Sequence, residues 1–186
     1  MNKPRLRRAI ALAVLPLLLA SHGYAQDFPP KKPVTLVVGF AAGGAADAAA
    51  RVIAKKLSEN IGQTVVVDNR GGAGGNIAHQ QVANGPADGS MLLLGSIGPL
   101  TIAPHVMKVN YDPFKDLAAV SGGVNFPNVL VVHKGLGIKT LAEFVALSKK
   151  NPGTVSFAST GAGSASHLAE VECRPRAERA AADYHH

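Results

Sequence analysis

Residues 34–47 read VTLVVGFAAGGAAD, a run of β-branched and leucine residues followed directly by small residues. The run at 34–38 is typical of a buried parallel strand. Residues 45–60 have the apolar spacing of an amphipathic helix, and Gly62 is expected to end it. The residues expected on its apolar face are Val52, Ile53 and Leu57. A strand, a glycine-rich loop and a helix in this order predict the start of an α/β fold.

The same order repeats downstream. Residues 64–67 (TVVV) predict a second strand, and the glycine-rich loop at 69–75 leads into a helix at 76–84 that Asn76 is expected to cap. Residues 91–94 (MLLL) predict a third strand. Alternation of strand and helix with short connections predicts a doubly wound α/β lobe with a parallel sheet.

The pattern changes after Tyr111. Residues 117–124 and 129–133 predict two further strands, and we interpret residues 125–128 as a crossing between two lobes. The expected organisation is a first lobe at 26–124 and the start of a second lobe at 125–170.

Within this second lobe, Thr140 and Glu143 form a capping-box motif that starts a helix ending near Lys150. A strand at 154–158 and a helix beginning at Ser164 are expected to follow. The last expected segment, 171–186, does not continue the alternation, and we interpret it as an aberrant tail or, alternatively, an ordinary ragged C-terminus.

Residues 1–25 have the three parts of a secretory signal peptide. Basic residues precede an apolar stretch at 9–20, and Gly23 and Ala25 place small residues at a cleavage site. This apolar stretch is shorter than the roughly 20 residues that span a bilayer, although an uncleaved anchor is an alternative. We therefore expect export to the periplasm with cleavage near Ala25.

The charge of the chain does not indicate a nucleic-acid partner. The formal net charge is +7, but four of the basic residues lie in the first eight positions. No basic stripe with interleaved aromatic residues follows, so no nucleic-acid binding is expected. The lone Cys173 excludes an intramolecular disulfide bond.

Three loops share one design, at 40–47, 71–76 and 159–164. Each follows a predicted strand, is rich in small residues and opens into a helix. Helix N-termini present free N–H groups and favour anions, and ligands of open α/β sheets bind beyond the carboxyl ends of the strands. The three loops together therefore predict an anion or carboxylate site, with tight turns and helix capping as the structural alternative.

Nucleotide and hydrolase sites fit the sequence poorly. No loop ends in the Gly-Lys-Ser/Thr of a P-loop, and residues 72–77 lack the third glycine of a dinucleotide fingerprint. Ser164 and His167 are three residues apart on a predicted helix and keep a Ser/His hydrolase open as an alternative, without an identifiable orienting acid. Three other histidines show no metal-ligand spacing, so neither metal nor cofactor is expected: His79, His105 and His133.

Several blocks of the chain resemble the Bug receptors, the substrate-binding proteins of tripartite tricarboxylate transporters. The most specific block is 57–76 (LSENIGQTVVVDNRGGAGGN). Other matching blocks are residues 32–44 with Asp47 and Arg51, residues 83–98, Tyr111-Asp112-Pro113, residues 128–132 and residues 159–169. The resemblance covers residues 28–169, and its blocks occur in the family's order.

This resemblance implies a periplasmic-binding-protein-like (type II-like) two-lobed Venus flytrap that holds a carboxylate between its lobes and is not an enzyme. The ligand-binding positions so implied are Phe40, Ala41, Ala42, Gly43, Gly44, Ala45, Asp47, Gly74, Gly75, Asn76, Ser96, Ser159, Thr160, Gly161, Ser164 and His167. The first loop departs from the family, because Ala41 and Ala42 stand where a proline is frequent and Ala46 where Thr or Ser is frequent.

The family implies a di- or tricarboxylate or an acidic amino acid as ligand, and membrane permease subunits as partners. Its members are about twice as long as this chain, so only the N-terminal half of the flytrap is expected. We accordingly expect binding to be impaired by truncation, with a non-functional fragment as an alternative.

Overall fold

The computed structural model describes residues 28–152, 154–156 and 158–173. The predicted signal peptide and residues 174–186 of the predicted tail therefore lie outside the described residues. Among the described residues, no helix has both the length and the apolar character needed to span a bilayer.

A three-stranded parallel sheet forms the centre of the N-terminal region, with the strand order β2-β1-β3. Its strands are β1 (Val34–Val38), β2 (Val65–Asn69) and β3 (Met91–Leu94). In this register Leu36 of β1 lies opposite Val67 of β2 and Leu92 of β3. The central strand is buried on both faces, which explains its uninterrupted apolar sequence. The predicted α/β class with a parallel sheet is confirmed.

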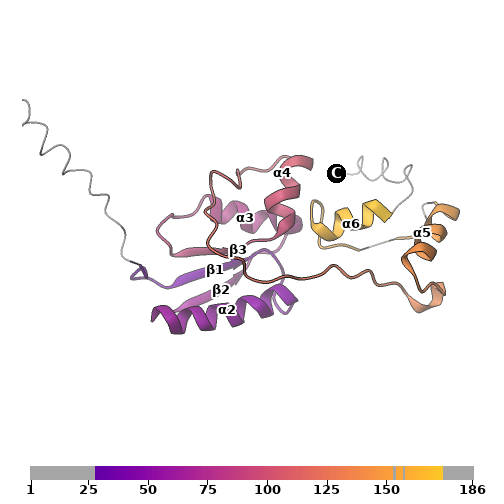
Figure 1. Cartoon of the computed structure of the whole chain (residues 1–186). Coiled ribbons are helices and arrows are strands. Elements are labelled where there is room, and N and C mark those ends of the chain that lie inside the picture. Colours follow the sequence, from indigo (N-terminus) through magenta and orange to yellow (C-terminus); the bar gives the residue numbers. More distant parts are fainter. Residues whose placement is uncertain (1–27, 153, 157, 174–186) are drawn as a thin grey trace, which may run out of the picture.

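The helices α2 (Ala45–Ile61) and α3 (Asn76–Ala83) cover opposite faces of this sheet (Figure 1). The residues that form the core between the sheet and α2 are Leu36, Val38, Ala50 and Ala54. Partly buried apolar side chains surround them, including Phe40, Ile53, Val65 and Leu94. The alanines of α2 have small side chains and let the helix approach the strands closely. The layer between helix and sheet is therefore tightly packed.

The faces of α2 differ from the prediction at one position. Val52 was expected in the apolar stripe, but it is 71% exposed. The buried face of α2 contains Asp47, Ala50 and Ala54 instead, at the three- and four-residue spacing of one helix face. The prediction for Gly62 is confirmed, since this residue ends α2 in the left-handed conformation (φ 65°) and donates its N–H to Ser58 O.

Beyond β3 the chain forms η2 (Gly98–Ile102, a π-helical turn) and α4 (Ala103–Val106), and then becomes irregular. The strands predicted at 117–124 and 129–133 are not formed, and the described residues of 154–158 are not in a strand. A strand needs a neighbour to accept its hydrogen bonds, and these segments run as single extended chains. Their apolar residues are consequently exposed, with Val120 at 87% and Val131 at 82%.

The remaining helices are η3 (Lys134–Leu136), α5 (Leu141–Lys150) and α6 (Ala165–Cys173). The predicted capping box is confirmed, since Thr140 Oγ1 accepts the Glu143 N–H at 3.2 Å and Glu143 Oε2 accepts the Thr140 N–H at 3.2 Å. Helix α6 runs past residue 170 to Cys173, into the segment that we expected to be foreign to the fold.

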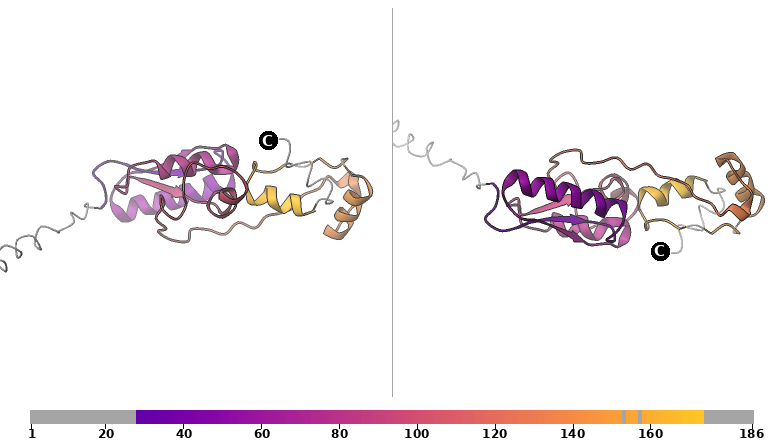
Figure 2. Two further views of the ribbon diagram at one scale, coloured as in Figure 1. Left: turned by 90° about the horizontal axis from the view of Figure 1, so that it is seen from above. Right: turned by 90° about the horizontal axis from the view of Figure 1, so that it is seen from below.

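The chain returns to the sheet after leaving it. Figures 1 and 2 show the extended segment running from the sheet to α5, and α6 lying between α5 and the sheet. This return brings the start of α6 to the same end of the sheet as the loops that follow β1 and β2. The lobe boundary near residues 125–128 stays a prediction.

Candidate functional site

The loops that follow β1 and β2 meet at the carboxyl edge of the sheet because both strands are parallel. A Cβ atom added to Gly39 would lie 3.0 Å from Gly75 Cα. Asn69, the last residue of β2, donates its side-chain amide to Phe40 O at 3.1 Å. The first two predicted loops are therefore in direct backbone contact.

The third predicted loop packs against the second. A Cβ atom on Gly74 (φ 62°) would lie 2.6 Å from Ala162 O, and one on Gly161 (φ 118°) would lie 2.7 Å from Gly74 N. Both the close approach and the positive φ angles require glycine. The structure thus joins the third loop to the second, although more than 80 residues of sequence separate them.

In the first loop, five of the predicted site residues are exposed at the entrance of α2: Ala41, Ala42, Gly43, Gly44 and Ala45. Phe40 is half-buried beside them. Gly44 is the N-cap and provides no side-chain cap, so the first N–H groups of α2 have no capping side chain.

Asp47 lies in the first turn of α2 and is only 4% exposed. Its Oδ2 atom accepts hydrogen bonds from the Gly43 N–H (2.8 Å) and from Arg51 Nε (3.0 Å). These contacts, the Arg51 bond first, hold the pKa of Asp47 below its ordinary value. The carboxylate therefore stays charged and braces the first loop, and Oδ1 is buried without a hydrogen-bond partner among the described residues.

In the second loop, Gly74, Gly75 and Asn76 are all buried. The prediction that Asn76 caps α3 is wrong, because Gly75 is the N-cap and no side chain caps this helix. The amide of Asn76 donates to Ala73 O at 2.7 Å, and its Oδ1 accepts from the Tyr111 hydroxyl at 2.7 Å. Asn76 shapes the loop, and α3 starts without a side-chain cap. The Gly75 and Asn76 N–H groups donate to Gly72 O and Ala73 O of the loop itself.

Ser96 follows β3 and lies beside this helix start. Its Oγ atom would be 3.6 Å from a Cβ on Gly75, and it is buried without a hydrogen-bond partner among the described residues. Its backbone N–H donates to His79 Nε2 at 3.2 Å. A hydroxyl with unused donor capacity next to an uncapped helix N-terminus is suited to a carboxylate oxygen.

In the third loop, Ser159 and Thr160 are exposed, whereas Ser164 is only 3% exposed. Ser164 Oγ accepts the His167 N–H at 3.2 Å, which is the geometry of an N-cap for α6. His167 Nδ1 accepts the Gly163 N–H at 3.4 Å. The loop is therefore held by its own polar groups, with Thr160 displayed at its surface.

Comparisons with known proteins identify the family of this chain. Residues 49–178 match the family described as the tripartite tricarboxylate transporter family receptor, TctC. The chain belongs to this receptor family. Among curated proteins, BugT of Bordetella pertussis is 39% identical over 174 residues, which are 90% of this chain and 52% of BugT.

Two solved structures of the receptor type are similar as well. The periplasmic binding protein BugD has a TM-score of 0.61 and 35% identity, covering 77% of this chain and 48% of that one. The R. palustris protein Rpa4515, solved with adipate, has a TM-score of 0.61 and 33% identity, covering 78% and 48%. These matches confirm the predicted family and agree with the prediction of a binding protein rather than an enzyme.

The chain spans about half the length of the curated relatives it matches. The half that it shares with them contains all three glycine loops.

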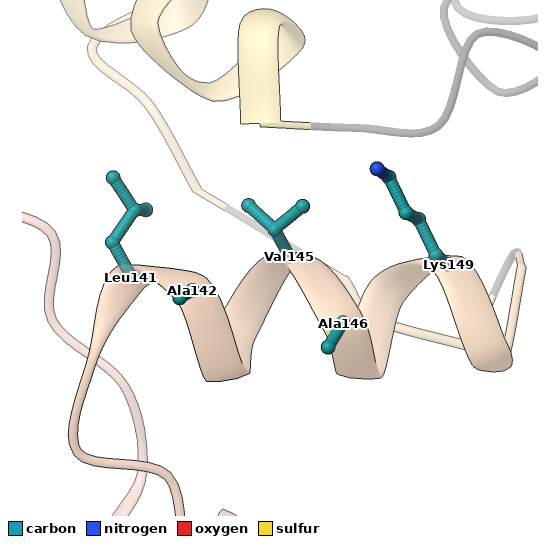
Figure 3. Close-up of a pocket in the computed structure, with 5 residues that line it drawn as sticks. All are labelled: Leu141, Ala142, Val145, Ala146 and Lys149. Carbon is teal, nitrogen blue, oxygen red and sulfur yellow. The ribbon is translucent and has the colours of Figure 1, made fainter.

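A pocket beside α5 is separate from the glycine loops. All of its lining residues belong to this one helix: Leu141, Ala142, Val145, Ala146 and Lys149 (Figure 3). None of them is a predicted site residue. The pocket is formed by the apolar face of one helix and includes no residue of the three loops.

Sequence reasoning missed several residues that build the site. Arg51 and Asn69 fix the first loop, His79 and Tyr111 hold the second, and Ser166 bridges Thr160 and Ser164 through hydroxyl contacts of 2.9 and 3.1 Å. A serine two positions after a helix cap carries no distinctive pattern. The burial of His79 follows only from its position on the sheet-facing side of α3.

Proposed function

We propose that this chain contributes the N-terminal half of a periplasmic receptor that binds a small carboxylate for a tripartite tricarboxylate transporter. The ligand class is a di- or tricarboxylate or an acidic amino acid, and the partners are membrane permease subunits. Export through a signal peptide cleaved near Ala25 is part of the same proposal. The periplasmic description of BugD and the adipate in Rpa4515 support it.

One observation carries the proposal. The uncapped N-terminus of α3 at Gly75 lies beside the unpartnered Ser96 hydroxyl, at the edge where the third loop returns. The negative charge of Asp47 lies at the start of a different helix, where it is paired with Arg51. We call the start of α3 at Gly75, together with the adjacent Ser96, the α3 corner. A carboxylate ligand would therefore be favoured at the α3 corner and disfavoured near Asp47.

Binding by this chain alone should be weak. A flytrap encloses its ligand with two lobes, and here the segments on the second side lack strand pairing and expose Val129 at 77% and Val131 at 82%. We expect isothermal titration of residues 26–186 with adipate to show little heat. Micromolar binding would contradict the expected impairment while supporting the carboxylate site.

Residual recognition is measurable by NMR. Millimolar adipate should shift the backbone amide signals of Gly75, Asn76 and Ser96, because these residues surround the helix start that has no side-chain cap. The matched control ligand is adipamide, which has the same length without charge and should leave the signals in place. Equal shifts with both compounds, or shifts confined to α5, would refute anion recognition at this corner.

A further inference from the structure

His79 is a buried group that the proposed function does not use. It lies on α3, one turn after the helix start, and its exposed fraction is 0%. Nδ1 is 2.9 Å from Gly75 O, and Nε2 is 3.2 Å from the Ser96 backbone nitrogen. The imidazole thus bridges the two groups that form the α3 corner.

The partners of this imidazole determine its protonation state. A carbonyl oxygen only accepts a hydrogen bond, so Nδ1 must carry a proton to bond Gly75 O. A backbone N–H only donates, so Nε2 must be unprotonated to accept from Ser96. Both bonds exist together only in the neutral ring with the proton on Nδ1.

We propose that His79 is a positioning residue that, as a neutral Nδ1-protonated imidazole, holds the end of β3 with Ser96 against the glycine turn at Gly75. The inference rests on the proposed function, because Gly75 and Ser96 matter here as ligand contacts. Protonation of Nε2 would place its N–H opposite the Ser96 N–H, so the hydrogen bond between them would be lost. Ser96 would be released, and the structure of the α3 corner would depend on pH.

The surroundings of His79 favour the neutral ring. Burial lowers its pKa, and the bond to Gly75 O offsets this in part. The elements packed against α3, namely β1, β3, η2 and the 3-10 turn η1 (Ala73–Gly75), contain no titratable residue. Tyr111 faces the ring at 6.2 Å between ring centres, and burial raises the pKa of its hydroxyl, so it is neutral too.

Tyr111 forms a second, non-titrating brace beside the first. Its hydroxyl lies 2.7 Å from Asn76 Oδ1 and 2.8 Å from Pro99 O. It therefore joins the first residue of α3 to the segment after β3, as His79 joins Gly75 to Ser96. Tyr111→Phe is a matched control that loosens the same corner without removing the imidazole.

The primary test needs no ligand. Long-range ¹H–¹⁵N spectra of the chain at pH 7.5 should show His79 with a protonated Nδ1 and an imine-type Nε2. His79→Asn, which offers a donor toward Gly75 but no acceptor toward Ser96, should move the Ser96 amide proton upfield. His79→Gln, whose side chain reaches far enough to offer an acceptor, should restore much of that shift. A ring protonated on Nε2, or an unchanged Ser96 signal in His79→Asn, would overturn the proposal.

The pH dependence gives a second readout. The folded-state pKa of His79 lies below the ordinary value of 6.5, so the unfolded chain binds this proton first. The contribution of His79 to stability should fall as the pH drops below 6.5 and level off once the folded ring is protonated. This dependence should disappear in His79→Gln and persist in Tyr111→Phe and in the exposed His105→Gln. Persistence in His79→Gln would count against the proposal.

Ligand titration separates this inference from the proposed function. If adipate shifts the amides of the α3 corner, His79→Asn should weaken that binding roughly 3- to 10-fold at pH 7.5, the equivalent of one lost hydrogen bond. If the His79 signature holds but adipate shifts no amide, the positioning role stands and the carboxylate function fails.

Discussion

Residues 34–106 and residues 107–173 are both rich in small and β-branched side chains, yet only the first region forms a sheet. In the first region, β1 has a parallel neighbour on each side and helices on both faces, and Val34, Val37 and Val38 are 0% exposed. In the second, valines such as Val120 and Val131 face solvent. The difference shows that strand-forming sequence becomes a strand only where backbone partners are supplied.

Among the described residues, the two regions meet at Tyr111, which bonds to Asn76 Oδ1, and at close glycine contacts. Gly74 touches the third loop, and a Cβ on Gly98 would lie 2.9 Å from Gly163 O. This contact makes the end of the second region part of the site, even though its middle remains unpaired. The comparison can be tested by substitutions that act on one region, on the other, or on the contact between them.

The largest effect is expected in the sheet. Val37→Asp should lower the free energy of unfolding by about 3–5 kcal/mol, because an unpaired charge would be buried in the central strand. Urea denaturation followed by circular dichroism measures this change. The matched substitution Val131→Asp, in the exposed segment, should change it by no more than about 0.5 kcal/mol. Similar losses from both would mean that the second region is as well packed as the first.

The contact between the regions comes next. Gly74→Ala should cost roughly 1–3 kcal/mol, because its Cβ would collide with Ala162 O at a positive φ angle. Hydrogen exchange should then increase in loop 159–164 while the sheet stays protected. Gly122→Ala is the control, since no atom lies within 4 Å of the added Cβ. Unchanged exchange in the loop would argue against the contact.

An intermediate effect on stability is expected from a substitution in the first loop. Asp47→Asn removes the Arg51 ion pair and weakens the bond to Gly43. Because the folded-state pKa of Asp47 is lowered, the stability it provides is present above the ordinary value of 3.8 and is lost as the pH falls through the folded-state pKa.

Unfolding measured from pH 7 to pH 2 should therefore show less acid destabilisation in Asp47→Asn than in the unmodified chain. Glu59→Gln, which removes an exposed pair with Lys56, serves as control and should leave the profile nearly unchanged. Identical profiles for all three chains would show that Asp47 does not brace the loop.

The smallest effect is expected in α5. Thr140→Ala removes the cap and should destabilise this helix by about 1 kcal/mol. Hydrogen exchange of the first-turn amides reports the change locally, without loss of the sheet. Thr140→Ser keeps the hydroxyl and should retain most of the protection. Unfolding of the whole chain by Thr140→Ala would mean that the two regions are more tightly coupled than the structure indicates.

Local patterns predicted a large part of the first region. The β-branched runs predicted β1 and β2, and the apolar run at 91–94 predicted β3. Gly62 predicted the end of α2, and Thr140 with Glu143 predicted the cap of α5. Each of these signals acts over a few residues, so neighbouring sequence is enough to recognise it. Val52 was misplaced because Ile53, next to it on the helix, belongs to the buried face and the two differ by about 100° in direction.

The other failed predictions involve partners that are distant in sequence. Asn76 has the side chain of a helix cap, but Tyr111, which is 35 residues away, takes its amide oxygen. The strands expected at 117–124 and 129–133 lack neighbours, which no property of their own sequence could reveal. His79 was an isolated histidine in the sequence and became a bridge only when α3 packed on β3.

The sequence by itself determined the alternating α/β elements of the first region and the glycine loops, because strand, helix and turn preferences are local. Its ordered blocks indicated the receptor family by resemblance. Only the tertiary structure decided which residues share the site. Parallel pairing of β1 with β2 and β3 brings the loop ends to one edge, and glycine contacts join the third loop to them. Burial then fixes His79 in one protonation state, since a hydrogen bond between enclosed groups requires one donor and one acceptor.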